Sequence, residues 1–284
     1  MDAALYAERR GSRVPAGLLR SVLSPAGSPS GERVIVNLRE RGVGAVVLDI
    51  EGTTTPIAFV YEVLFPFART NLRAYLQEHR RADALRAVLA RLEEEWSADV
   101  EQGHAPPAWP ARATDGDDAG AGAAGNVEWL MDRGRKSPGL KALQGMIWER
   151  GYLQGGLHGE VFADVPAAVA RWRVASIDVA IYSSGSELAQ RLIFGHTKYG
   201  DLTPYFSRFF DTAVGAKVSS DSYRRIAGKL VRSASEILFV SDVTTELDAA
   251  REAGLQVLLC VRPGNRPQPS HTFPSINSFE EMTV

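Results

Sequence analysis

The chain has 284 residues, 45% of them hydrophobic and 23% charged, with a formal net charge of −2. This length and composition predict a globular protein with a full core, in one large or two modest domains. The near-neutral charge excludes a general basic field for nucleic acid or an anionic membrane, so we expect a small-molecule partner. The N-terminal sequence lacks the apolar region of a secretory signal and no apolar run approaches a membrane span, which predicts a cytoplasmic location.

The first 43 residues differ in composition from the rest of the chain. They are rich in arginine and contain the turn-rich stretch "SPAGSPSGE", Ser24–Glu32. We interpret residues 1–43 as a flexible N-terminal extension, with a short ordered piece at "RVIVNLRER".

From residue 44 the pattern alternates apolar strands with amphipathic helices. Four short apolar runs have strand length: "AVVLDI", "IDVAIYS", "EILFVSD" and "LQVLLCV". The segments that follow or separate these runs have helical spacing, as in "SELAQRLIFG" and "TELDAAREAG". This alternation predicts an α/β core domain with a doubly wound parallel sheet, formed by residues 44–60 and 155–284. Cys260, the single cysteine, lies in the last of these runs and is expected to be a buried thiol.

Residues 61–154 interrupt this alternation. They contain no convincing strand but two long stretches of helical pattern, which predict a separate helical domain inserted after the first strand. Between these stretches, residues 105–126 are rich in Pro, Gly and Ala, and we expect a flexible loop there.

Polar and charged residues gather where the predicted strands end. Ligands of an open parallel sheet collect beyond the carboxyl ends of its strands. The residues in question are Asp49 and Glu51 after the first strand, Ser183 and Ser184 after the second, Asp242 after the third, and Lys217 between the second and the third. Each of them alone has an ordinary explanation as a turn, cap or solvated residue. Their joint occurrence at one sheet edge favours a site.

Phosphoryl transfer is the chemistry that needs this set of residues. Asp49 could attack phosphorus as a carboxylate nucleophile, and water could then cleave the aspartyl-phosphate. Glu51 could protonate the leaving alcohol and later activate water. Carboxylate oxygens suit Mg²⁺, whereas serine hydroxyls and Lys217 would hold phosphate oxygens.

The order of these residues resembles the haloacid dehalogenase-like superfamily, and within it the enolase-phosphatases of methionine salvage. The similarity covers about residues 45 to 284. The stretches that carry it are "LDIEGTTTPIAFV", "YSSGS", "FGHTKYGDL", "FDTAVGAKVSSDSYRRIA" and "DVTTELDAAREAG".

The resemblance implies a role for each matching residue. Asp49 would be the nucleophile and a metal ligand, Glu51 a metal ligand and the acid/base group, and Asp242 the third metal ligand. Ser183, Ser184 and Lys217 would bind the substrate phosphate. The cofactor would be one Mg²⁺ per subunit, and the helical insertion would be the cap that closes over the substrate.

The reaction implied is the conversion of 2,3-diketo-5-methylthiopentyl-1-phosphate to an acireductone and phosphate, by a chain expected to be a monomer. Two alternatives stay open: a phosphatase for another small metabolite, and a non-catalytic binding module of the same fold. The base for enolisation is also open, because Glu51 is one candidate and Lys217, Lys136 or Lys141 could polarise the carbonyl instead.

Overall fold

A computed structural model of the chain describes residues 34–110, 119–135 and 137–284. These residues form two compact units, which we call the core unit (residues 34–66 and 148–284) and the helical unit (residues 67–147). Most of the predicted N-terminal extension, the middle of the predicted loop and Lys136 lie outside the described residues.

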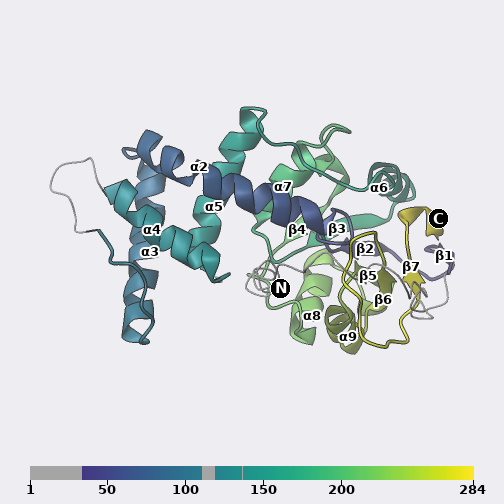
Figure 1. Cartoon of the computed structure of the whole chain (residues 1–284). Helices are drawn as coiled ribbons and strands as arrows, with labels where there is room; N and C mark the ends of the chain where they lie inside the picture. The colour runs from purple at the N-terminus through teal and green to yellow at the C-terminus, as the bar shows by residue number, and fades with distance from the viewer. Residues whose placement is uncertain (1–33, 111–118, 136) are drawn as a thin grey trace, which may run out of the picture. The chain divides into compact units, whose positions relative to one another are not determined.

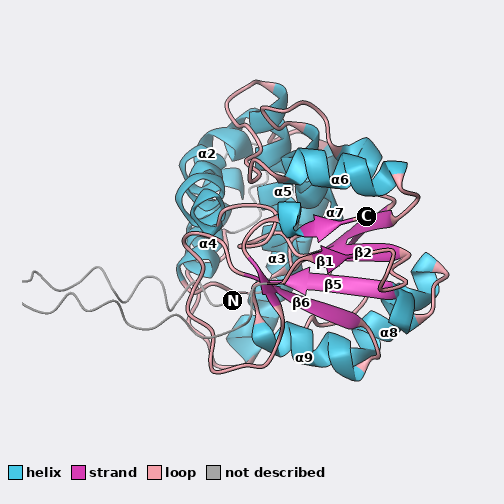
Figure 2. Cartoon of the chain, turned by 90° about the vertical axis from the view of Figure 1, so that its right-hand side faces the viewer, coloured by secondary structure: helices cyan, strands magenta, loops and turns pink. Residues whose placement is uncertain are grey.

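A six-stranded parallel sheet is the centre of the core unit (Figures 1 and 2). Its spatial order is β4-β3-β2-β5-β6-β7, and every neighbouring pair is parallel. The strands are β2 (Ala45–Leu48), β3 (Asp178–Tyr182), β4 (Arg208–Phe210), β5 (Ile237–Ser241), β6 (Gln256–Cys260) and β7 (Ser275–Ile276). The four predicted strands and the parallel α/β class are confirmed. The sequence pattern does not predict β4 and β7, because strands of two or three residues are too short for a periodic pattern.

Helices cover both faces of this sheet (Figure 2). The helices α6 (Val165–Val174) and α7 (Glu187–Gly195) lie on one face, and α8 (Ser220–Leu230) and α9 (Thr244–Glu252) lie on the other. Alternate residues of β2, Ala45 and Val47, join a buried cluster with Tyr223 of α8 and Leu247 of α9. All four β2 residues are fully buried, which explains why the strand reads as a continuous apolar run.

The first and last described segments pair with each other. A two-stranded parallel sheet joins β1 (Val36–Asn37) to β8 (Met282–Thr283). Val36, Leu38 and Val43 are buried, so residues 34–43 of the predicted extension pack on the core unit. Short 3-10 turns complete this unit: Thr203–Tyr205, Ala234–Glu236 and Phe279–Glu281.

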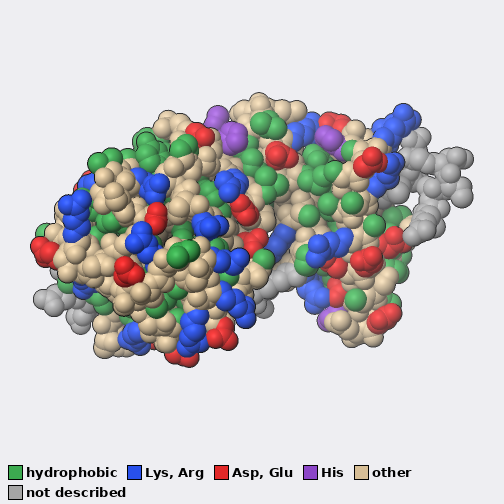
Figure 3. All heavy atoms as spheres, turned by 180° about the vertical axis from the view of Figure 1, so that it is seen from behind, with side chains coloured by type: hydrophobic (Ala, Val, Ile, Leu, Met, Phe, Trp, Pro, Cys, Tyr) green, Lys and Arg blue, Asp and Glu red, His purple; other side chains and the backbone are tan. Residues whose placement is uncertain are grey.

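In the described part of the chain, four long helices follow β2. A π-helical turn, η2 (Phe59–Leu64), leads into α2 (Phe65–Glu78), α3 (Asp83–Glu101), α4 (Ala119–Asp132) and α5 (Pro138–Leu153). Within the helical unit, Arg69 and Arg73 of α2 pair with Asp132 and Glu128 of α4. Figure 3 shows basic and acidic side chains interspersed over one face of the protein. Among the described helices, none is long and apolar enough to cross a membrane.

The expectation of a flexible loop over residues 105–126 is wrong for its last third. Residues 119–126 form the first two turns of α4. Alanine has the highest helix propensity of the residues, and it alternates here with glycine. Ala123 and Ala124 are fully buried, so tertiary packing adds to this propensity and outweighs the cost of the glycines.

Candidate active site

The predicted site residues of three strands lie at one edge of the sheet. Asp49 directly follows β2, Ser183 follows β3 and Asp242 follows β5. The register brings these ends level, because Leu48 of β2 pairs with Ile181 of β3 and with Val240 of β5. The structure therefore places these three residues together at the carboxyl edge, where ligands of doubly wound sheets bind.

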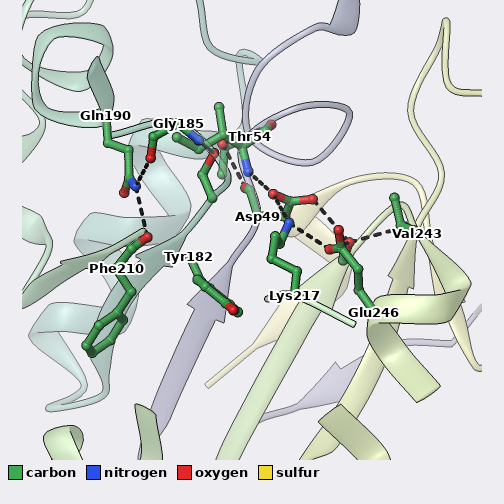
Figure 4. A network of polar contacts seen from close by, with 12 residues as sticks. Asp49, Thr54, Tyr182, Gly185, Gln190, Phe210, Lys217, Val243 and Glu246 are labelled. Carbon is green, nitrogen blue, oxygen red and sulfur yellow. Dashed lines mark hydrogen bonds and ion pairs between the residues drawn. The ribbon is translucent and has the colours of Figure 1, made fainter. Parts of the chain in front are cut away.

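Lys217 binds two carboxylates at this edge (Figure 4). Its Nζ lies 2.6 Å from Asp49 Oδ1 and 2.6 Å from Glu246 Oε2. Ser241 Oγ lies 3.2 Å from Asp49 Oδ2 and 3.0 Å from Glu246 Oε2, so it joins the same two acids. The backbone N–H of Ile50 also donates to Asp49 Oδ1, at 2.8 Å. Asp49 is thus held by donors on both of its oxygens.

Aromatic hydroxyls fix the loop that carries Lys217. Tyr223 Oη donates to the carbonyl oxygen of Lys217 at 2.7 Å, and Tyr182 Oη donates to that of Gly215 at 2.9 Å. Ser222 Oγ donates to Ala216 O at 2.8 Å. The lysine side chain is only 9% exposed, so this loop delivers a buried cation to the sheet edge.

Burial and crowding of charge shift the pKa values at this edge. Burial and, after it, the charge of the neighbouring Asp49 together raise the pKa of Glu51 to about 7. Burial and then Asp49 raise the pKa of Asp242 to about 8. For Lys217, burial lowers the pKa, but the charges of Asp49 and Glu246 outweigh burial and the pKa is raised. The edge therefore carries more buried negative charge than one lysine balances.

Buried oxygen atoms without donors mark the place that a cation would fit. Among the described residues, neither carboxylate oxygen of Asp242 has a hydrogen-bond partner, although both are buried. Beside them Gly52 has a φ of +72°, and a Cβ on this residue would collide with the Asp242 carboxylate. The glycine thus lets the Asp242 carboxylate lie directly against the turn after β2. Oxygen donors of this kind suit Mg²⁺, so the residues present fit such an ion.

The described carboxylates do not form a metal site by themselves. Within the described ranges, no three His, Cys, Asp or Glu side chains gather in a group that could hold a metal. A cation at this edge would therefore need further oxygen ligands besides carboxylates.

The serines after β3 have different surroundings. Ser183 is buried, and its Oγ accepts a hydrogen bond from the N–H of Gly185 at 3.1 Å. Ser184 is exposed. Ser186 caps α7 by accepting from Ala189 N, so the cap interpretation of "SSGS" holds for its last serine. Gln190 of α7 donates to the carbonyl oxygens of Gly185 and Phe210, and this brace supports the turn.

The sequence pattern does not assign Glu246 and Ser241 to the site. Glu246 follows Asp242 by one helical turn, but this spacing is equally that of a solvated helix residue. Only the contact with Lys217 distinguishes it, and that contact joins segments 29 residues apart in the chain. Ser241 is the last residue of a buried strand, and its side-chain direction depends on the register of β5 with β2.

Known proteins of one family share this chain's sequence and fold. A profile of the haloacid dehalogenase-like hydrolases matches residues 43–254. Enolase-phosphatase E1 of Synechococcus elongatus is 43% identical over 240 residues, which cover 84% of this chain and 98% of that protein. Enolase-phosphatase E1 of Drosophila melanogaster is 44% identical over 227 residues, 80% of this chain and 86% of that protein.

A longer relative and a solved structure extend the comparison. The chain spans 46% of a probable bifunctional methylthioribulose-1-phosphate dehydratase/enolase-phosphatase E1 of Vitis vinifera, with 47% identity over 246 residues. The crystal structure of the UTR4 protein of Saccharomyces cerevisiae aligns with a TM-score of 0.67 and 32% identity, covering 84% of this chain and 99% of that one. The chain therefore belongs to the haloacid dehalogenase-like hydrolase family, among the enolase-phosphatase E1 proteins.

Proposed function

We propose that the chain is a Mg²⁺-dependent enolase-phosphatase of methionine salvage. Its reaction converts 2,3-diketo-5-methylthiopentyl-1-phosphate to the acireductone 1,2-dihydroxy-3-keto-5-methylthiopentene and phosphate. The observation that carries the proposal is the buried Asp49 at the end of β2, held by Lys217 and Ser241. The names and the identity of the curated relatives support the choice of substrate.

Asp49 is the nucleophile in the proposed reaction. Its Oδ1 is engaged by Lys217 and by the N–H of Ile50, at 2.6 and 2.8 Å. Oδ2 has the longer contact, 3.2 Å to Ser241 Oγ, and is the oxygen with more freedom to attack. A bond forms from this oxygen to phosphorus while the bond from phosphorus to the alcohol oxygen breaks, which gives an aspartyl-phosphate.

Glu51 moves the protons in both half-reactions. It donates a proton to the departing alcohol oxygen and then accepts one from the water that attacks phosphorus. The attack of water breaks the bond between phosphorus and Asp49 and restores the carboxylate. Ser183, Ser184 and Lys217 hold the phosphate oxygens through hydroxyl and ammonium donors.

Oxygens of Asp49, Glu51 and Asp242 would hold the Mg²⁺ ion together with further oxygen ligands, one ion per subunit. When bound, the ion supplies positive charge that offsets the phosphate and the surrounding carboxylates. The two unpartnered oxygens of Asp242, which lie directly against Gly52, support this assignment.

Enolisation is the step that separates this function from that of a general phosphatase. We propose Glu51 as the base, since its side chain is one methylene longer than that of aspartate. A Glu51→Asp variant is expected to consume diketone more slowly without an equal loss in phosphate release from a simple ester. Equal losses in both reactions would contradict this role.

The function is tested by a single assay of two products. Purified protein with Mg²⁺ should release phosphate from the diketone phosphate and produce the ultraviolet-absorbing enediol. Asp49→Asn and chelation by EDTA should each abolish both signals. Asp248→Asn is the matched control, because that carboxylate is 57% exposed on α9 and pairs only with Arg251 among the described residues.

A panel of other phosphate esters separates the alternatives. Phosphate release from another ester without any enediol signal would favour a different metabolite as substrate. Binding of Mg²⁺ with no turnover across the panel would favour a binding module. Full activity of Asp49→Asn would refute the proposal.

A further inference from the structure

An amide in the loop after β6 reaches the same edge of the sheet. Asn265 Nδ2 lies 2.9 Å from the carbonyl oxygen of Gly52 and 3.1 Å from that of Cys260. Both partners are acceptors, so the nitrogen of the amide must face them. The orientation of the amide is therefore determined, and its oxygen faces the other way.

The oxygen of this amide lies in the space beside the unpartnered carboxylate. A Cβ built on Gly52 would lie 2.8 Å from Asn265 Oδ1 and 2.7 Å from Asp242 Cγ. Asn265 Oδ1 is buried and has no donor among the residues that the structure describes. The two oxygens of Asp242 share this condition, so three buried acceptors without donors lie close to one another beside Gly52.

Three buried acceptors without donors are unfavourable unless a positively charged group binds them. A buried acceptor without a partner is destabilising, and more so when it is charged. A divalent cation with its water ligands would satisfy all three oxygens at once. Amide and carboxylate oxygens are also the ligands that Mg²⁺, Ca²⁺ and Mn²⁺ prefer.

We propose that Asn265 supplies the side-chain oxygen that completes the divalent-cation site beside Asp242. This explains how a cation can be held where the described acidic and imidazole side chains do not form a metal-binding group on their own. The inference rests on the proposed function to the extent that a divalent cation binds at this edge. The nitrogen of the amide would hold the loop through its two hydrogen bonds, and the oxygen would face the cation.

Two variants of similar size separate these two roles. Asn265→Leu and Asn265→Asp both remove the two N–H donations to Gly52 and Cys260. Only Asn265→Asp keeps an oxygen that can face the cation. A purely structural clamp is lost equally in both variants, whereas a group that contacts the cation or its water is lost only with leucine.

The measurement is the binding of Mn²⁺ to the full chain, which is detected as a loss of the electron paramagnetic resonance signal of free Mn²⁺. Asn265→Leu should raise the dissociation constant by about 10–100-fold, which is the usual effect of losing a supporting group at a metal site. Asn265→Asp should bind Mn²⁺ at least as tightly as the unaltered chain. Melting temperatures without metal should fall in both variants, which reports the lost clamp. If the leucine variant does not fold, Asn265→Ala takes its place.

Gln268→Ala is the matched control from the same loop. Gln268 Oε1 accepts from Thr244 N at 3.2 Å, so this amide also clamps the loop. Its variant should lose stability without losing affinity for Mn²⁺. Equal weakening of binding in Asn265→Leu and Asn265→Asp, or binding within twofold of the unaltered chain in Asn265→Leu, would overturn the inference. Failure of the unaltered chain to bind Mn²⁺ would instead refute the metal site of the proposed function.

Discussion

At the scale of single residues, Gly52 shows why the turn after β2 needs glycine. Its φ of +72° lies in the left-handed region, and the site of its absent Cβ lies against Asp242. Gly42 has a similar φ of +68°, but a Cβ there would meet nothing within 4 Å. A side chain at Gly42 would therefore bring only backbone strain, whereas a side chain at Gly52 would also collide with Asp242.

Replacing each glycine by alanine tests this distinction. Both variants should lose about 1–2 kcal/mol of unfolding free energy, because a left-handed backbone is unfavourable for residues with a Cβ. Only Gly52→Ala should also lose phosphatase activity, by more than about tenfold, since the added methyl displaces the Asp242 carboxylate. Urea denaturation and the phosphate assay measure the two effects. Equal activity of the two variants would contradict the interpretation.

Cys260 provides a second test at this scale. The thiol is 1% exposed, and burial raises its pKa to about 12 from an ordinary value of 9.0. At pH 8 the folded chain should hold about one part in 10⁴ of the thiol as thiolate, so Ellman's reagent should react only when urea unfolds the protein. Rapid labelling of the native protein would contradict this burial.

The same shift predicts a dependence of stability on pH. Between pH 9 and 12 the unfolded chain loses the thiol proton while the folded chain keeps it, so rising pH favours unfolding. Cys260→Ala should therefore lose unfolding free energy less steeply than the unaltered chain across this range. Other groups also titrate there, and the difference between the two chains isolates the cysteine. Parallel curves would contradict the prediction.

At the scale of elements, the loop before α8 delivers Lys217 to the ends of β2 and β5. A lysine on a polar loop reads from sequence as a solvated residue, and the local pattern contains no sign of its burial. The tyrosines that anchor the loop come from β3 and α8, and their rings pack edge to face with centroids 5.5 Å apart. The position of this loop therefore depends on contacts with the sheet and with α8, which its own sequence does not contain.

Removal of one anchoring hydroxyl should loosen this loop. Tyr223→Phe leaves the buried carbonyl oxygen of Lys217 without its 2.7 Å donor, at a cost of about 1–3 kcal/mol in unfolding free energy. The turnover number should fall several-fold as Lys217 loses its position. Tyr152→Phe is the control, because the buried Tyr152 hydroxyl has no partner among the described residues. Equal stability losses in the two variants would show that the hydroxyl of Tyr223 is not an anchor.

At the scale of the whole molecule, a buried ion pair ties distant segments of the core unit together. Arg262 Nη1 lies 2.8 Å from Asp164 Oδ2, with side chains 4% and 9% exposed. Arg262 also donates to the carbonyl oxygens of Thr53 and Asn277, at 3.2 and 2.9 Å. One guanidinium thus contacts the turn after β2, the start of α6 and the C-terminal segment.

Breaking this pair should destabilise the whole core unit. Arg262→Met leaves the carboxylate of Asp164 buried without its cation, which costs about 3–5 kcal/mol. Arg86→Met is the control, because its pair with Asp83 is 64% and 89% exposed and is expected to contribute less than about 1 kcal/mol. Urea denaturation of both variants checks the contrast. Similar losses would contradict the importance of burial.

Local sequence pattern by itself determined the parallel α/β class, the four long strands and the carboxyl edge that Asp49, Ser183 and Asp242 share. These features follow from apolar periodicity, which extends over a few residues and can be read along the chain. The prediction of a loop was wrong at the start of α4, because the helix propensity and the burial of its alanines outweighed a composition typical of loops.

Only the tertiary structure decided which side chains meet. Ser241 contacts Asp49 across 192 residues, and Asn265 contacts Gly52 across 213. The tertiary structure also decided the pairing of Lys217 with Glu246. It likewise decided the short strands β1, β4, β7 and β8. Such contacts depend on strand register and on the burial of the complete core, and no local segment of sequence encodes either of them.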